Sequence, residues 1–152
     1  MTTHVPAGGN SLNPYIFVKD AREAIAWYVE NLNADEGFLM PGPGGEGVMH
    51  AEIKLGECTL MLGDANSEWG TSAPGEGHSS NHLMVYVPDV DTTMSSCLRG
   101  GARELAPVMD MFWGDRVGKI QDPFGHVWII ATHVEDVSEA EVAERAKQAF
   151  GG

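Results

Sequence analysis

The sequence predicts an α+β fold of two tandem βαβββ modules that form an open, curled sheet with a cleft, followed by a C-terminal helix. Three observations predict it. A strand-to-helix junction recurs, because Val87-Pro88-Asp89 follows Val18-Lys19-Asp20 after 69 residues. Each junction is followed by a helical pattern and then by strand-like segments. One such module cannot cover both faces of its sheet, so two in tandem are expected within the 152 residues.

The first module begins with a strand and a helix. The segment "PYIFV" (14–18) is rich in aromatic and β-branched residues, which favours a strand. In "DAREAIAWYVENL" the apolar residues recur at helical spacing, and Trp27 and Tyr28 are expected in the core. Asp20 with Glu23 three residues later is typical of a helix N-terminus.

Three strands complete this module. They are expected in "ADEGFLM", "VMHAEIKL" and "CTLMLGD", the last two joined in a hairpin by Gly56-Glu57. Module one thus covers about 12–63, and the polar, glycine-rich residues 64–80 are expected to form an exposed loop.

Module two covers about 81–133 and repeats the order of the first. After its strand and helix, the segments "APVMDMFW", "DRVGKIQ" and "HVWIIATH" are expected as strands. Ser138 with Glu141 indicates the start of a C-terminal helix over about 138–150. We therefore expect residues 1–152 to form a single domain of two modules and one further helix.

Charge and composition limit the partners. The 22 acidic and 9 basic residues give a net charge of −13, which repels phosphate backbones and anionic lipids, so neither nucleic acid nor membrane is expected as a partner. The N-terminal residues lack the pattern of a secretory signal, which indicates a cytoplasmic protein. Cys58 and Cys97 have no metal-ligand spacing and are expected as buried, reduced thiols.

Three segments carry a family resemblance: "VKDAREAIAWYVENL", "HLMVYVPDVD" and "GDRVGKIQDPFGHVWIIATH". Together they resemble the vicinal oxygen chelate superfamily of glyoxalases, bleomycin-resistance proteins and extradiol dioxygenases. The "FWGDR" and "DPFGH" motifs with the final "ATH" are most similar to small bacterial glyoxalase-like proteins, and the resemblance covers roughly residues 12–150. It implies paired βαβββ modules around an open cleft, commonly in a homodimer.

The resemblance also implies four metal-ligand positions. Metal-using members place His, Gln or Glu on cleft-facing positions of the first and last strands of each module. Carried over to this sequence, the positions fall on His82, Asn13, Ile129 and, within about one residue, Met61. Because only His82 is a good ligand for a divalent first-row metal, we expect no metal and no other cofactor.

His50 and Glu52 offer an alternative. They are two residues apart, hence on one face of a strand, and together with His82 they are candidates for a recruited metal site. The protein would then be a metal-dependent lyase, isomerase or dioxygenase. Against this, His-x-Glu-x-Lys is also typical of the solvent face of a half-buried strand.

Strand alternation predicts what lines the cleft. If His82 faces the cleft, Met84 and Tyr86 do too, and Tyr15 and Phe17 share a face with Asn13. Trp69 and the Phe112-Trp113 pair are candidates to close over a planar ligand. The predicted ligand-binding residues are therefore Tyr15, Phe17, Met61, His82, Met84, Tyr86, Trp113 and Ile129.

These residues favour a small-molecule binding protein that needs no metal, with an apolar or aromatic compound as its ligand. Whether the protein is also an enzyme stays open, because His82 as a general base would need no metal either. Asp115-Arg116 allows two interpretations, a clamp for a polar ligand group or an ordinary solvated pair at a hairpin. The identity of the ligand and the pairing of the modules, within a chain or between chains, also stay open.

Overall fold

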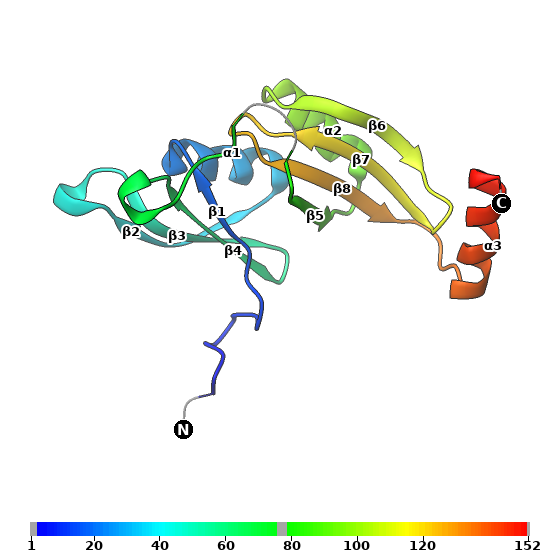
Figure 1. The fold of residues 1–152 in the computed structure, drawn as a ribbon, viewed down its shortest axis with the longest axis horizontal. Helices are drawn as coiled ribbons and strands as arrows, with labels where there is room; N and C mark the ends of the chain where they lie inside the picture. The colour runs from blue at the N-terminus through cyan, green and yellow to red at the C-terminus, as the bar shows by residue number, and fades with distance from the viewer. Residues whose placement is uncertain (1–2, 76–78, 152) are drawn as a thin grey trace. The chain divides into compact units, whose positions relative to one another are not determined.

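A computed structural model describes residues 3–75 and 79–151 (Figure 1). They form two four-stranded mixed sheets, each with a helix, and a C-terminal helix, which confirms the predicted fold class. The chain divides into two compact units, residues 1–78 and 79–152, which we describe separately as the first and the second unit. Residues 76–78 of the predicted loop lie outside the described part. Among residues 3–75 and 79–151, no helix combines the length and apolarity that a membrane crossing requires.

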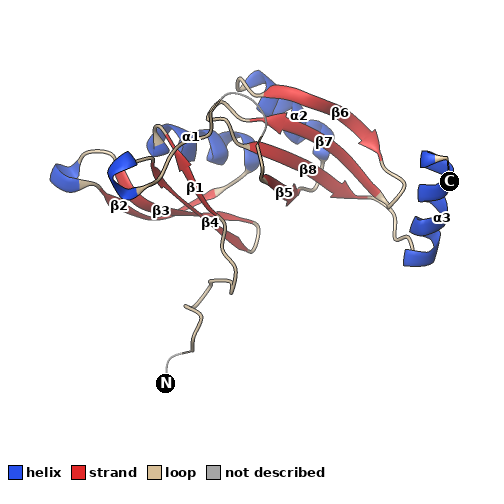
Figure 2. Ribbon diagram, in the orientation of Figure 1, coloured by secondary structure: helices blue, strands red, loops and turns tan. Residues whose placement is uncertain are grey.

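The sheet of the first unit has the strand order β1-β4-β3-β2, with β1 parallel to β4 and the other pairs antiparallel. Helix α1 packs against this sheet (Figure 2). The elements are β1 (Tyr15–Val18), α1 (Ala21–Leu32), β2 (Asp35–Pro41), β3 (Val48–Leu55) and β4 (Cys58–Asp64), with short 3-10 turns at Pro43–Gly45 and Ser67–Trp69.

The sheet of the second unit repeats this topology in the order β5-β8-β7-β6, with β5 parallel to β8. Helix α2 packs against β6, β7 and β8. The elements are β5 (His82–Tyr86), α2 (Val90–Arg99), β6 (Arg103–Asp110), β7 (Asp115–Gln121), β8 (Val127–His133) and α3 (Glu139–Phe150).

Side chains that alternate along the strands build a core between each sheet and its helix. Trp27 and Tyr28 are buried, as predicted, and Trp128 of the second unit is buried too. Asp20, Asp89 and Ser138 cap the three helices by accepting backbone N–H groups of the first turn, which confirms the predicted starts of α1 and α3. The opposite face of each sheet, turned away from its helix, is called here the helix-free face.

Two expectations about local structure are wrong. The strand expected over "APVMDMFW" ends at Asp110, because Met111 to Gly114 form a turn closed by a hydrogen bond from the Gly114 N–H to the Met111 carbonyl. Cys97 is buried and free as expected, but the free Cys58 is exposed. Cys58 begins β4 beside the two-residue turn at Gly56-Glu57, and all three residues are exposed at this end of the hairpin.

Candidate functional site

The helix-free face of the first unit carries aromatic side chains. On β1, Ile16 and Val18 are buried against α1, so alternation turns Tyr15 and Phe17 to the other face. Their rings stack with centroids 4.9 Å apart. Met61 pairs with Tyr15 across the parallel β1–β4 ladder and therefore shares that face.

Tyr15 belongs to a chain of hydrogen bonds. Its hydroxyl lies 2.8 Å from Nδ1 of His50, and Nε2 of His50 lies 3.2 Å from Oε1 of Glu52. Because a carboxylate only accepts, Nε2 of a neutral His50 carries the proton, and Nδ1 accepts from the Tyr15 hydroxyl. Burial raises the pKa of Tyr15 above its ordinary value. Both ring nitrogens of His50 are thus engaged within this unit.

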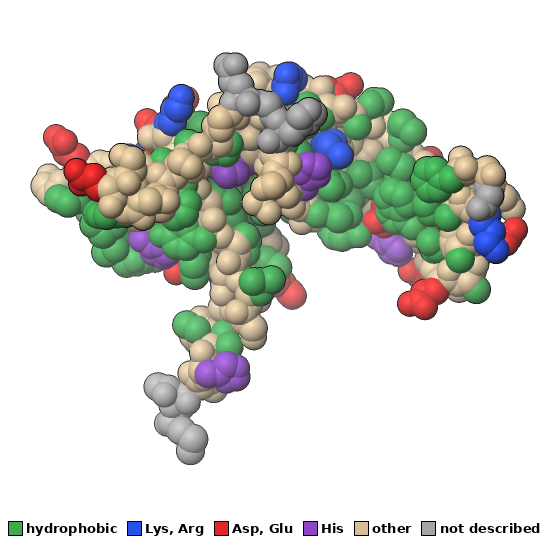
Figure 3. All heavy atoms as spheres, in the orientation of Figure 1, with side chains coloured by type: hydrophobic (Ala, Val, Ile, Leu, Met, Phe, Trp, Pro, Cys, Tyr) green, Lys and Arg blue, Asp and Glu red, His purple; other side chains and the backbone are tan. Residues whose placement is uncertain are grey.

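The helix-free face of the second unit is more apolar. His82, Met84 and Tyr86 are exposed at alternate positions of β5, and Ile129 pairs with Met84 across the β5–β8 ladder. Figure 3 shows hydrophobic side chains gathered over β7 and β8 in this unit. Exposed apolar side chains that lie together on one face indicate a binding surface more often than isolated ones do.

Asp115 organises the polar groups at the end of this face. Oδ2 of Asp115 accepts from the Tyr86 hydroxyl at 2.7 Å and from Nε1 of Trp113 at 3.2 Å. Its other oxygen, Oδ1, lies 2.8 Å from Nδ1 of His133, and Nε2 of His133 lies 2.7 Å from Asp136. The Asp115 side chain is only 5% exposed, so it is a buried carboxylate that three donors satisfy.

The turn before β7 places these groups. Gly114 has φ +102°, and a Cβ there would collide with the carbonyl oxygen of Glu135, so glycine is required. The turn delivers Trp113 next to Asp115, and the β7–β8 ladder pairs Asp115 with His133. Tyr86, at the end of β5, reaches the same carboxylate from across β8.

The hydrogen bonds set the charges of the cluster. Burial raises the pKa of Asp115, but the hydrogen bonds from His133, Tyr86 and Trp113 outweigh it, so the pKa lies below its ordinary value. Hydrogen bonds to Asp136 and Asp115 raise the pKa of His133, because each ring nitrogen meets a carboxylate and both must carry protons to donate. The hydrogen bond to Asp115, followed by burial, raises the pKa of Tyr86.

The four positions that the family resemblance assigned to a metal do not fit one. Asn13 engages its side-chain amide with the backbone of Asn10, Met61 offers only a thioether, and Ile129 offers no donor. His82 alone is a good ligand. Among the described residues, no group of three or more His, Cys, Asp or Glu side chains is arranged to hold a metal ion.

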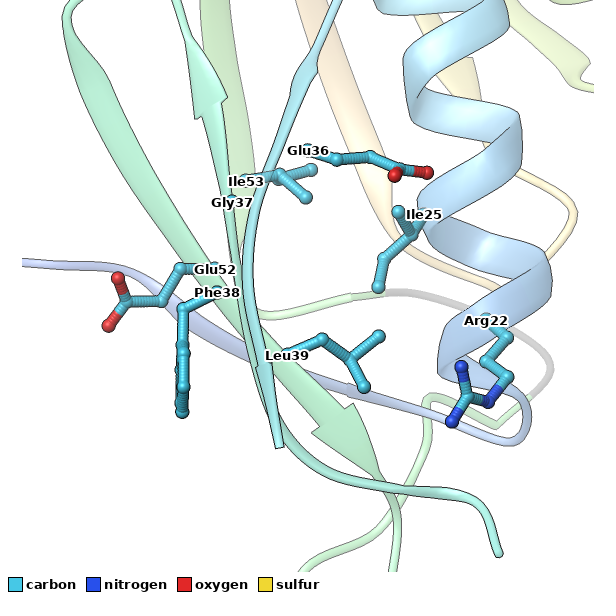
Figure 4. Close-up of a pocket in the computed structure, with 8 residues that line it drawn as sticks. All are labelled: Arg22, Ile25, Glu36, Gly37, Phe38, Leu39, Glu52 and Ile53. Carbon is cyan, nitrogen blue, oxygen red and sulfur yellow. The ribbon is translucent and has the colours of Figure 1, made fainter. Parts of the chain in front are cut away.

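A small hollow lies on the other side of the first sheet, between α1 and β2 (Figure 4). Leu39, Ile25 and Arg22 point into it, whereas Phe38 and Glu52 lie on the far side of β2. Its volume of about 180 Å³ is below the roughly 300 Å³ at which pockets for drug-sized ligands begin. It is therefore a weaker candidate than the helix-free faces.

Known proteins are similar to this chain in sequence and in fold. Residues 10–130 match the family model described as the glyoxalase/bleomycin resistance protein/dioxygenase superfamily. The chain belongs to this superfamily. An uncharacterized protein of Mycobacterium bovis is 33% identical over 136 residues, which are 87% of this chain and 89% of the relative. The predicted resemblance is thus confirmed.

Solved structures agree with this chain in fold. TioX from Micromonospora sp. ML1 is 25% identical, with a TM-score of 0.65 over 83% of this chain and 100% of its own. The fosfomycin resistance protein FosX from Listeria monocytogenes, in complex with Mn(II) and sulfate, is 16% identical, with a TM-score of 0.63 over 91% of this chain and 97% of its own. The likeness to FosX shows the fold alone.

The predicted ligand-binding residues fall into two groups. Tyr15, Phe17 and Met61 lie on the helix-free face of the first unit. His82, Met84, Tyr86 and Ile129 lie on that of the second, and Trp113 is fixed to Asp115 beside it. That they line one cleft and bind a ligand stays a prediction.

Asp115 and Arg116 do not form the solvated pair that one interpretation assumed. They point to opposite faces of β7, where Asp115 is buried and Arg116 binds Asp91 and Asp110. The pairing of Asp115 with His133 was not predicted from the sequence, because it depends on the β7–β8 register. The available signal was that Asp115 begins and His133 ends the predicted hairpin, so that an antiparallel pairing would bring them together.

Proposed function

We propose that the protein binds a small apolar or aromatic compound on its helix-free faces and needs no metal to do so. The observation that carries the proposal is the exposure of Met84, Tyr86 and Trp113 in the second unit, where Tyr86 and Trp113 both donate to the buried carboxylate of Asp115. A bound ligand would remove these apolar side chains from water, and this burial has a favourable free energy.

The donor chemistry supports independence from a metal. A divalent first-row ion needs several nitrogen, oxygen or sulfur ligands around one point, and the Asn13, Met61 and Ile129 positions supply no anionic donor. The alternative, a metal-dependent lyase, isomerase or dioxygenase with His82, His50 and Glu52 as ligands, would require His50 to give up a hydrogen bond to Tyr15 or Glu52.

The first experiment measures metal content and ligand binding on the same protein. We expect no stoichiometric ion by elemental mass spectrometry, and we expect calorimetry with a panel of aromatic compounds to give the same affinities before and after a chelator. An ion retained at about one per chain, together with binding that the chelator abolishes, would instead support the metal-dependent alternative.

A pair of variants locates the ligand. Met84→Ser removes an exposed apolar side chain from the helix-free face and should weaken binding roughly tenfold, the order expected when a methionine no longer contributes burial. Leu12→Ser is the matched control, because Leu12 is exposed but lies outside both faces. Equal affinities in the two variants would contradict the assignment of the face.

A further inference from the structure

The second unit indicates which class of compound binds there, an inference that rests on the proposed function. We propose that the ligand is an organic cation, a quaternary or protonated amine with apolar groups, seated on the rings of Tyr86 and Trp113. Asp115 acts as a positioning residue that fixes and polarises both rings.

The polar atoms of Tyr86 and Trp113 are hydrogen-bonded, whereas their rings are exposed. The Tyr86 hydroxyl and the Trp113 N–H donate to the same oxygen of Asp115, which is itself buried. Yet Tyr86 is 58% exposed and Trp113 37% exposed, so the rings remain open to a ligand. Because the polar ends are fixed, a ligand would not have to order these side chains on binding.

The hydrogen bonds also change the rings electronically. An aromatic ring carries negative charge on its face, and a cation above that face is attracted. When the hydroxyl of Tyr86 and the indole N–H of Trp113 donate to a carboxylate, electron density moves toward both rings. Their attraction for a cation therefore exceeds that of the same rings bonded to water.

The local charge favours the same class. Asp115 and Asp136 flank His133, so the three groups together carry a negative charge even when the imidazole is protonated. Lys119 lies on the same face in the row of Met84 and Ile129, one row from Tyr86 and two from Asp115. Arg103 pairs with Gln121 at the opposite end of β7 from Asp115. The net charge of −13 adds a long-range attraction for cations and a repulsion for anions.

The test compares two molecules of nearly the same shape on the full chain. Phenyltrimethylammonium carries a charge, and tert-butylbenzene is its neutral counterpart. Calorimetry at low ionic strength should give the cation an affinity about 5- to 30-fold higher, the range expected for a partly desolvated cation–π contact. Equal affinities, or tighter binding of the neutral compound, would overturn this inference and leave the proposed function in place.

Variants then test the role of Asp115. Asp115→Asn keeps the shape but removes the charge, and Tyr86→Phe keeps the ring but removes the hydroxyl donor. Both should reduce the ratio of the affinity for the cation to the affinity for tert-butylbenzene. Tyr86→Phe also serves if Asp115→Asn does not fold. Glu104→Gln, an exposed charge on β6, is the matched control and should keep the full preference.

The outcomes distinguish the two proposals. If both variants keep the full preference for the cation, the positioning role of Asp115 is refuted. If neither compound binds and the aromatic panel also gives no binding, the proposed function itself is refuted.

Discussion

In the first unit a tyrosine on the helix-free face donates to an imidazole, whereas in the second unit a tyrosine donates to a buried carboxylate. The two sheets are otherwise built alike, because Ala51 pairs with Leu62 as Gly118 pairs with Ile130. The units therefore share a scaffold and differ in the chemistry of one face. The side of each sheet that packs against the helix stabilises the fold. The residues of the helix-free face are not bound by this packing, so they can differ between the units.

The largest expected effect concerns a helix anchor that the units build differently. Asp64 accepts the backbone N–H groups of Ala21 and Val48, at 2.8 and 2.7 Å. In the second unit the hydroxyl of Thr132 accepts the N–H of Val90, which begins α2 as Ala21 begins α1. The last strand of each unit thus anchors its helix.

Asp64→Ala should lower the free energy of unfolding in urea by about 2–3 kcal/mol, because two partly buried donors lose a charged acceptor. Thr132→Ala should lower the free energy of unfolding by less, about 1 kcal/mol, which is the typical effect of removing a neutral helix cap. If Asp64→Thr recovers a substantial part of the loss, the two anchors are equivalent. Equal costs for the two alanine variants would contradict the comparison.

A smaller effect on stability is expected where a residue of the sheet and a residue of the helix are matched in size. Gly118 lies against the side chain of Met94, and a Cβ there would approach the Met94 sulfur to 2.8 Å. The corresponding residues of the first unit are Ala51 and Ile25, a larger strand residue with a different helix residue. Each pair is expected to fill its own space.

Gly118→Ala should therefore cost about 1 kcal/mol, since the end of the flexible Met94 side chain must shift. The double variant Gly118→Ala with Met94→Ile reproduces the pair of the first unit and should be more stable than Gly118→Ala alone. Urea unfolding measures both, and additive losses would show that the two positions are independent.

The smallest expected effect is the pH dependence of the His133 cluster. The pKa of His133 is raised in the folded protein, so its charged form is preferred in the folded state. The stabilisation is complete below the unfolded pKa, about 6.5, and is lost as the pH rises through the higher folded pKa. His133→Gln should remove this dependence.

The measurement is the free energy of unfolding of the native protein and of His133→Gln between pH 5.5 and 8.5. Their difference should shrink toward high pH. A difference that stays constant or grows would show that the carboxylates on both sides of His133 do not stabilise its charged form.

Much of the fold follows from local signals. Asp20 and Ser138 start helices because their side chains bond nearby backbone groups, which requires no distant residue. The alternation that turned Tyr15 and Phe17 away from the core is likewise local, since it follows from the pleat of one strand. These features were predictable because their partners lie within a few residues.

The candidate site was less predictable because its contacts span distant segments. Tyr86 and Trp113 were expected on a ligand-binding surface, but their common attachment to Asp115 depends on the tight turn at Gly114. The polar composition of the "GDR" turn predicts exposure to solvent. The register of the sheet instead buries the Asp115 carboxylate, which accepts from three donors.

The sequence by itself determined the repeated strand-to-helix junction, the helix starts and the alternation of the strands, since each arises from the conformational preferences and short-range bonds of neighbouring residues. Only the tertiary structure decided that Asp115 is buried and that His133 lies between two carboxylates. Burial and charge coupling depend on which strands pair and in what register, and a residue's own sequence neighbours do not specify that.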